Sequence, residues 1–190
     1  MIALLGVGHS AVLGLLGTLP QGVPVLVCLD QDSAGKAGAA KLACALVERG
    51  RTVSVVVDRD GYASAKRVVR ELGARCGPAP KWPLERPLTG REAWPLEGPL
   101  SKGHLPEATV ALGELAHAKA AHPLVAQEIA RLAARATSPL AEEETHRLWG
   151  AIVHVAIVDG WVAMGIARGV NWRGEKDLGA LLAKGRPVTL

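Results

Sequence analysis

Two aspartates set two residues apart, Asp30 and Asp32, follow the apolar run from Val25 to Leu29. A short run of this kind, rich in β-branched residues, predicts a buried strand. In extended backbone, residues i and i+2 face the same way, so both carboxylates can bind one hard cation, Mg²⁺ or Mn²⁺. We therefore assign Asp30 and Asp32 as the candidate catalytic and metal-binding residues.

A helix is predicted to begin directly after this pair and to run from Ser33 to Arg49, with Gly50 as the residue that ends it. The free N–H groups at the start of a helix attract anions. Ser33 and Lys36 lie in the first turn, so both are candidate phosphate ligands. The alternative for Lys36 is a solvated side chain with no ligand.

A second acidic pair, Asp58 and Asp60, follows the strand predicted from Val53 to Val57 and precedes Gly61. Strand–helix–strand units form parallel sheets, so both acidic pairs are expected at the same carboxyl edge. We predict that Asp58 and Asp60 also serve the metal site, because a cation offsets the repulsion between neighbouring carboxylates. The alternative is that both residues form a turn with Gly61.

The next predicted helix, from Tyr62 to Leu72, carries a basic face of Lys66, Arg67 and Arg70. A basic face beside an acidic metal site suits a phosphodiester substrate, so these three residues are candidate nucleic-acid ligands. The alternative is an ordinary solvated helix face.

The sequence Asp-Gln-Asp-Ser-Ala-Gly at residues 30–35, placed after an apolar strand, resembles the toprim domain of bacterial primases, topoisomerases and related nucleases. The similarity covers about residues 2–72 and includes Ala39, Ala40, Leu42, the segment from Leu46 to Gly50 and the strand from Val53 to Val57. It implies a parallel, Rossmann-like sheet with helices and Mg²⁺-dependent phosphoryl transfer on DNA or RNA, in a primase-like protein of DNA replication.

Toprim domains also carry a catalytic glutamate in an earlier strand and turn, and this sequence starts at Met1, too late to contain it. Glu48 and Glu71 precede the proline-rich segment, but both are expected at helix ends away from the acidic pairs. We therefore expect this chain alone to lack nucleotidyl transfer. We expect the chain to be a fragment of a longer primase-like protein whose upstream segment completes the sheet and supplies the glutamate. The alternatives are a partner chain that completes it and an inactive module that binds a nucleic acid or nucleotide.

A second interpretation starts from Gly6-x-Gly8-x-x-Ala11, which follows the strand predicted from Ile2 to Leu5. This motif fits the dinucleotide fingerprint, and Asp30 lies at a suitable distance for a ribose contact. An NAD(P)-binding oxidoreductase of the Rossmann type is therefore the alternative function.

Two glycines count against that alternative, because Gly14 and Gly17 fall in the helix that the fingerprint requires. Each costs about 1 kcal/mol relative to alanine in a helix interior. A phosphatase of the haloacid dehalogenase type also places Asp-x-Asp after a strand, but its pair is followed by a loop. Here a helix is predicted to follow the pair directly.

Three regions are predicted along the chain. Residues 1–76 form the α/β domain, residues 77–104 a proline-rich linker or arm, and residues 105–190 a small all-helical domain. In the last region Ser138 is the predicted N-cap of a long apolar helix. His154 and Asp159 lie in that helix and are expected to be satisfied polar groups of the core.

Composition limits the classes of partner and compartment. With 49% hydrophobic residues the chain can bury a core, and its net charge of +4 permits a nucleic-acid partner. Three cysteines without a C-x-x-C pair indicate the reducing cytoplasm. No membrane association is expected, because the longest apolar run, Leu148 to Ala167, contains His154 and Asp159.

Overall fold

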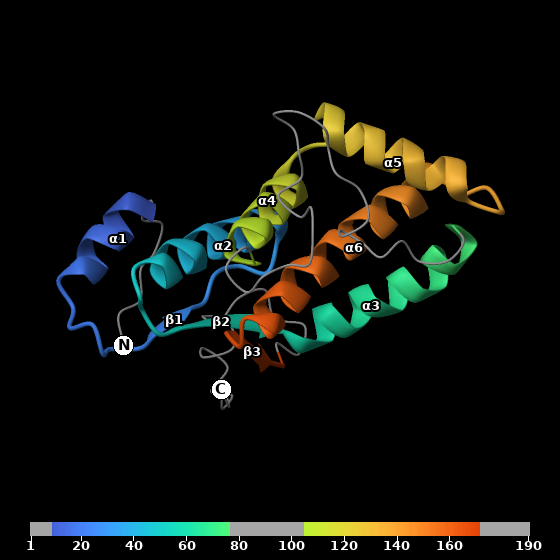
Figure 1. Ribbon diagram of the computed structural model, residues 1–190. Helices are drawn as coiled ribbons and strands as arrows, with labels where there is room; N and C mark the ends of the chain where they lie inside the picture. The colour runs from blue at the N-terminus through green and yellow to red at the C-terminus, as the bar shows by residue number, and fades with distance from the viewer. Residues whose placement is uncertain (1–8, 77–104, 172–190) are drawn as a thin grey trace.

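The computed structural model describes residues 9–76 and 105–171 (Figure 1). The glycine motif at residues 6–8, the strand predicted before it, the proline-rich arm and the short helix predicted at residues 177–183 lie outside these ranges. In chain order the elements are α1 (His9–Gly17), β1 (Val25–Val27), α2 (Ser33–Glu48), β2 (Val53–Asp58), α3 (Arg59–Gly73), the 3₁₀ turn η1 (Ala74–Cys76), α4 (Leu105–His117), α5 (Pro123–Arg135), α6 (Glu142–Ala163) and β3 (Ala167–Val170).

The predicted strand–helix–strand unit is present, with β1 and β2 parallel. Val25 lies opposite Val53, and Val27 lies opposite Val55. Helix α2 makes the connection and buries an alanine-rich face that contains Ala39 and Ala40. Gly50 ends this connection with a φ of 70°, a conformation that glycine adopts without strain. The expectation of a parallel α/β arrangement is therefore confirmed for these two strands.

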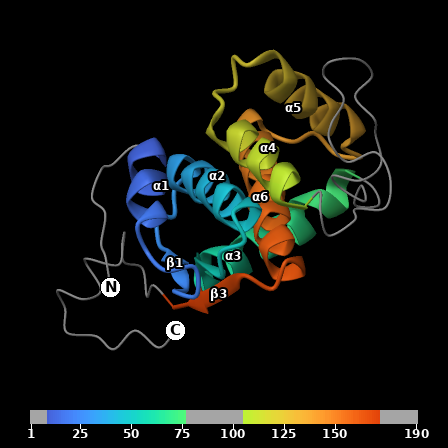
Figure 2. The same ribbon diagram turned by 60° about the vertical axis from the view of Figure 1, so that its left-hand side comes forward.

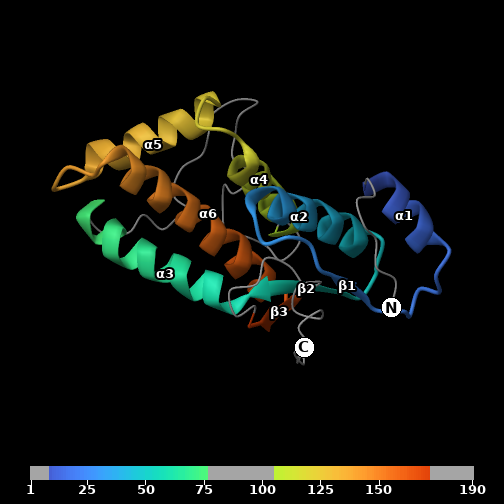
Figure 3. The ribbon, with the colours of Figure 1, turned by 180° about the vertical axis from the view of Figure 1, so that it is seen from behind.

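A third strand comes from the C-terminal half, which the sequence predicts to be all helical. Strand β3 pairs in parallel with β2, with Val55 opposite Ala167 and Asp58 opposite Val170. Helix α6 runs back toward the sheet, and the chain turns at Gly165, whose φ is 74°, before it enters β3 (Figures 1 and 3). The C-terminal half therefore adds a strand beside β2 as well as helices.

Helices from both halves of the chain share one hydrophobic core. Helix α2 packs against α4 (Figure 2), and their backbones come close at Gly113, where a Cβ atom would lie 2.9 Å from the Cα of Ala37. Helix α6 lies between α3 and α4 and contacts both (Figure 1). It contributes the buried side chains of Leu148, Ile157 and Trp161 to the core.

Helix α1 forms although it contains Gly14 and ends at Gly17, two residues that lower helix propensity. A long-range interaction holds the end of this helix. The guanidinium of the buried Arg51 donates hydrogen bonds to the carbonyl oxygens of Leu16 and Leu19, each at 2.7 Å. These bonds tie the last turn of α1 and the turn that follows it to Arg51, in addition to the hydrogen bond that Leu16 accepts from the N–H of Leu19 at 3.2 Å.

Helix α6 begins later than predicted, and Ser138 is not its N-cap. The N-cap is Ala141, whose N–H donates to a carboxylate oxygen of Glu144 at 2.9 Å. The hydroxyl of Ser138 instead accepts a hydrogen bond from Nε of Arg75 at 3.0 Å. No helix in the described ranges has the length and apolar character needed to cross a membrane.

Candidate functional site at the carboxyl edge of the sheet

The segments that follow β1 and β2 are joined by the side chain of Gln31. Its Nε2 donates to the carbonyl oxygen of Leu29 at 3.0 Å, and its Oε1 accepts from the N–H of Asp58 at 3.2 Å. The two strands are parallel, so Asp30 and Asp32 follow one strand at the edge where Asp58 ends the other. The fold therefore places the two acidic segments at the same edge of the sheet.

Asp32 and Asp58 each begin a helix. Oδ1 of Asp32 accepts from the N–H of Gly35 at 2.7 Å and caps α2. Oδ1 of Asp58 accepts from the N–H of Asp60 at 3.1 Å and caps α3. Each cap uses one carboxylate oxygen, so the second oxygen of each aspartate remains available for a ligand.

The first turn of α2 lies directly against the backbone of Asp30, which follows the end of β1. A Cβ atom on Gly35 would collide with the carbonyl oxygen of Asp30, so this position requires glycine. The small residues after the acidic pair thus have a structural reason, which is the close approach of helix and strand backbone.

Helix α3 begins at Arg59 and not at Tyr62, so the turn interpretation of the second pair is wrong. Asp58 is an N-cap, and Asp60 lies in the first helical turn. The positive end of the helix dipole stabilises negative charge at both positions. An aspartate at the end of a strand can therefore be explained by capping alone, without a cation.

Lys36 is not the solvated side chain of the alternative interpretation. It is partly buried, and its ammonium group donates to the carbonyl oxygen of Gln31. Burial lowers the pKa of Lys36, whereas the charges of Asp58 and Asp32 act in the opposite direction. One cationic group is thus already near carboxylates from both acidic segments.

The remaining predicted ligands lie on exposed surfaces. Ser33 is exposed in the first turn of α2. Lys66, Arg67 and Arg70 are all exposed on α3, which is strongly amphipathic. The ammonium of Lys66 lies 4.6 Å from the centre of the Tyr62 ring. These three basic side chains could face a polyanion without rearrangement of the core.

Asp159 and His154 differ from the satisfied core groups that the sequence predicts. Asp159 is exposed and accepts a hydrogen bond from the hydroxyl of Tyr62. His154 is partly buried, and its buried Nε2 has no hydrogen-bond partner among the described residues. Burial, and secondarily the charge of Lys36, lowers the pKa of His154 to about 4. A histidine in an apolar run carries no local signal of this kind, so sequence reasoning missed it.

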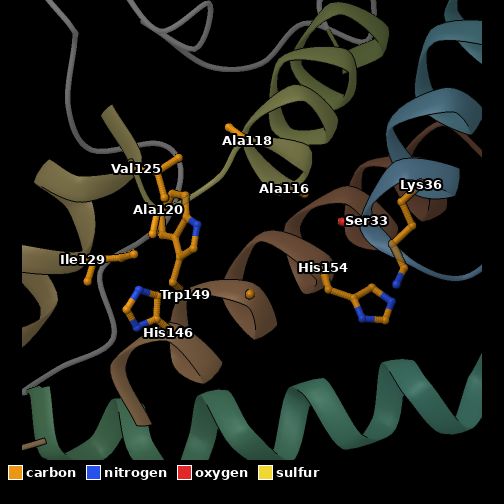
Figure 4. Close-up of a pocket in the computed structure, with 11 residues that line it drawn as sticks. Ser33, Lys36, Ala116, Ala118, Ala120, Val125, Ile129, His146, Trp149 and His154 are labelled. Carbon is orange, nitrogen blue, oxygen red and sulfur yellow. The ribbon is translucent and has the colours of Figure 1, made fainter. Parts of the chain in front are cut away.

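His154 and Lys36 also line a cavity of about 290 Å³ between α2, α5 and α6, which the end of α4 and the segment that joins α4 to α5 also border. Figure 4 shows the Lys36 side chain directed toward the imidazole of His154. Trp149 and His146 lie nearer the N-terminus of α6, close to Val125 and Ile129 of α5 (Figure 4). The cavity is thus separate from the acidic pairs except at the first turn of α2.

The acidic side chains at this edge could bind Mg²⁺ only with one or two protein ligands. Within residues 9–76 and 105–171, no three side chains of the His, Cys, Asp and Glu types gather closely enough to enclose a metal ion. Mg²⁺ is commonly held by one or two carboxylates together with water and substrate phosphate. Asp30 and Asp32 could hold it in that way. The chain has no significant match among protein-family models, curated proteins or solved structures.

Proposed function

We propose that the carboxyl edge of the sheet binds Mg²⁺ or Mn²⁺ through Asp30 and Asp32 and presents the ion to a phosphodiester of DNA or RNA. The observation that carries the proposal is the bridge from Gln31 to Asp58, which holds both acidic segments at one edge beside Lys36. In this proposal the sheet is of the Rossmann-like, toprim type, and the chain is part of a primase-like system in the cytoplasm.

Each group at this edge has a distinct role in the proposal. Asp30 and the free oxygen of Asp32 hold the cation, and water and substrate phosphate complete its coordination. Asp58 and Asp60 add negative charge at the same edge. The bound cation would polarise a phosphoryl oxygen. Lys36 and the N-terminus of α2 bind a phosphate oxygen of the substrate. Lys36 also neutralises part of the acidic charge, so we expect the chain alone to bind the cation weakly.

The basic face of α3 supplies the second half of the proposal. Lys66, Arg67 and Arg70 are exposed on the helix that starts at Asp58. Such residues neutralise backbone phosphates without reading sequence. No residue is assigned to activate an attacking hydroxyl, because Glu48 and Glu71 lie toward the C-terminal ends of α2 and α3. The proposal is therefore cation-dependent nucleic-acid binding, with transfer chemistry requiring the glutamate that the resemblance implies.

A calorimetric titration with Mn²⁺ tests the metal site. Asp30→Asn with Asp32→Asn removes two charges, yet asparagine still caps a helix, so α2 should survive. We expect this double variant to lose Mn²⁺ binding and to melt at a higher temperature in metal-free buffer, because carboxylate repulsion is relieved. Glu142→Gln with Glu143→Gln is the matched control, since it also removes two charges at a helix N-terminus. Equal Mn²⁺ binding by all three proteins would disprove the metal site.

Fluorescence anisotropy with labelled single-stranded DNA tests the basic face. Changing Lys66, Arg67 and Arg70 to glutamine should weaken binding and flatten its salt dependence. The log–log slope should fall by about 0.7 for each DNA phosphate that the variant no longer neutralises. An unchanged slope would remove α3 from the interface.

A dinucleotide site remains the second candidate because α1 is a helix, as the motif Gly6-x-Gly8-x-x-Ala11 requires. Asp30 would then bind the ribose instead of a cation. Titration with NAD in the same calorimeter separates the two functions. Binding of NAD that is lost on Asp30→Asn and unaffected by Mn²⁺ would favour the oxidoreductase.

A further inference from the structure

The cavity between α2, α5 and α6 has one polar and one apolar end. Ser33, Lys36 and His154 lie at the polar end (Figure 4). The other end is formed mainly by apolar side chains, which include Trp149 and Val125, together with the ring of His146. At about 290 Å³ the space is near the lower limit of small-molecule sites. It is large enough for one small organic molecule and too narrow for a folded partner.

The polar end has unused hydrogen-bonding capacity. Within residues 9–76 and 105–171 the buried Nε2 of His154 has no partner, and an unpaired buried polar atom is costly enough that proteins seldom retain one. The ammonium of Lys36 donates to the carbonyl oxygen of Gln31, and an ammonium has three N–H donors. Figure 4 shows these two side chains directed toward each other. An anionic group placed between them would bind both.

Small residues line part of the mainly apolar end, beside the large ring of Trp149. Ala116, Ala118 and Ala120 line it. Gly150 also lines it, and a Cβ atom built on this residue would meet no described atom within 4 Å outside the adjoining backbone of its own helix. An apolar ligand group would therefore enter this end without displacing the protein.

We propose that this cavity binds a small organic anion, with its phosphate or carboxylate between Lys36 and His154 and a flat apolar body toward Trp149. A nucleoside monophosphate represents the phosphate source of this chemistry, and indole-3-acetate represents the carboxylate source. The proposal goes beyond cation binding at the acidic edge and does not depend on Asp30.

Calorimetric titrations of the full chain with AMP, indole-3-acetate, adenosine and inorganic phosphate test the chemistry. We expect at least one of the two organic anions to bind about tenfold more tightly than adenosine or phosphate, because each of the latter engages only one end of the cavity. The tighter of the two identifies the headgroup. If neither organic anion binds more tightly than adenosine and phosphate do, the proposal is wrong.

A cavity-filling variant tests the location. Gly150→Leu should abolish binding while preserving or raising the melting temperature, since leucine is a better helix former than glycine. Gly14→Leu is the matched control, because Gly14 is also helical and has open space around it but lies outside the cavity. Unchanged binding by Gly150→Leu, or equal loss in both variants, would overturn the proposal.

Two further variants test the anion-binding end even if Gly150→Leu fails to fold. Lys36→Met and His154→Gln should each weaken the preferred anion about tenfold and leave the affinity for adenosine unchanged. A variant that weakens adenosine and the anion equally would indicate a general loss of structure and would contradict the assigned headgroup position. Mn²⁺ binding by His154→Gln should match that of the wild type, so the cavity and the metal site can fail separately.

Discussion

His154 should make the stability of this fold depend on pH. Burial first, and the ammonium of Lys36 second, lower the pKa of His154 from 6.5 to about 4 in the folded protein. In the unfolded chain the ring recovers its ordinary pKa. Between these two values the unfolded chain binds a proton that the folded protein does not. Proton uptake by His154 therefore does not affect the free energy of unfolding above pH 6.5. As pH falls toward 4, it favours the unfolded chain and the folded protein loses stability.

The size of this effect follows from the pKa difference. Each factor of ten in proton affinity is worth about 1.4 kcal/mol, so a lowering to about 4 corresponds to about 3 kcal/mol. The side chain is partly exposed, and solvent relaxation reduces the effect, so we expect about 2 kcal/mol. Small domains are stable by only about 5–15 kcal/mol in total. The loss should be easy to measure.

This loss of stability can be measured by urea unfolding of the wild type and of His154→Gln between about pH 4 and pH 8. Carboxylates titrate in both proteins, so the difference between the two free energies of unfolding isolates the histidine. That difference should be constant above about pH 7 and should shift by about 2 kcal/mol, in favour of the variant, by about pH 4. His146→Gln, on the same helix with its ring nitrogen near the carbonyl oxygen of Glu142, is the control.

A free-energy difference that stays constant across the whole pH range would refute this account of His154. Lys36→Met provides an internal check, because it removes the second cause of the lowered pKa. The pH dependence of that variant should be smaller than that of the wild type. A larger dependence would mean that Lys36 does not act on His154 in the way described.

The other predictions concern three glycines and the buried Arg51. Gly35→Ala should lower the free energy of unfolding by about 1–3 kcal/mol, because its methyl group collides with Asp30. Gly14→Ala should raise it by up to about 1 kcal/mol, because alanine is the better helix former. Thermal melts show whether each variant is less or more stable than the wild type. Gly113→Ala should lower the melting temperature by pushing α4 away from α2, and a stabilised variant would contradict the close packing. Arg51→Met should speed amide hydrogen exchange in α1 selectively, and uniform exchange rates across the chain would contradict its anchoring role.

Local patterns in the sequence are sufficient to predict the strand–helix–strand unit. The run Val53–Val57 and the stop at Gly50 are signals that neighbouring residues carry, and the strands they predict pair in parallel as expected. Helix boundaries were harder. The start of α3 depends on Asp58 acting as an N-cap, and the same residues before Gly61 are equally typical of a turn.

Long-range features could not be predicted because no local pattern encodes them. The segment Ala167–Val170 is four residues long and contains both arginine and glycine, so it becomes a strand only through pairing with β2. Arg51 has no sequence signal for its bonds to the end of α1. His154 likewise differs from a satisfied core histidine only in its surroundings, which the fold determines.

The pairing of β2 with β3 has a consequence for synthesis on the ribosome. Roughly a hundred residues separate these two strands, and at about 5–20 residues per second their translation is separated by roughly 5–20 s. During that interval the valine-rich β2 has a free edge on the side that β3 later covers. An exposed apolar edge of this kind is a site for pairing with other chains. The nascent protein therefore depends on rapid completion of α6 and β3, or on a chaperone, to avoid aggregation.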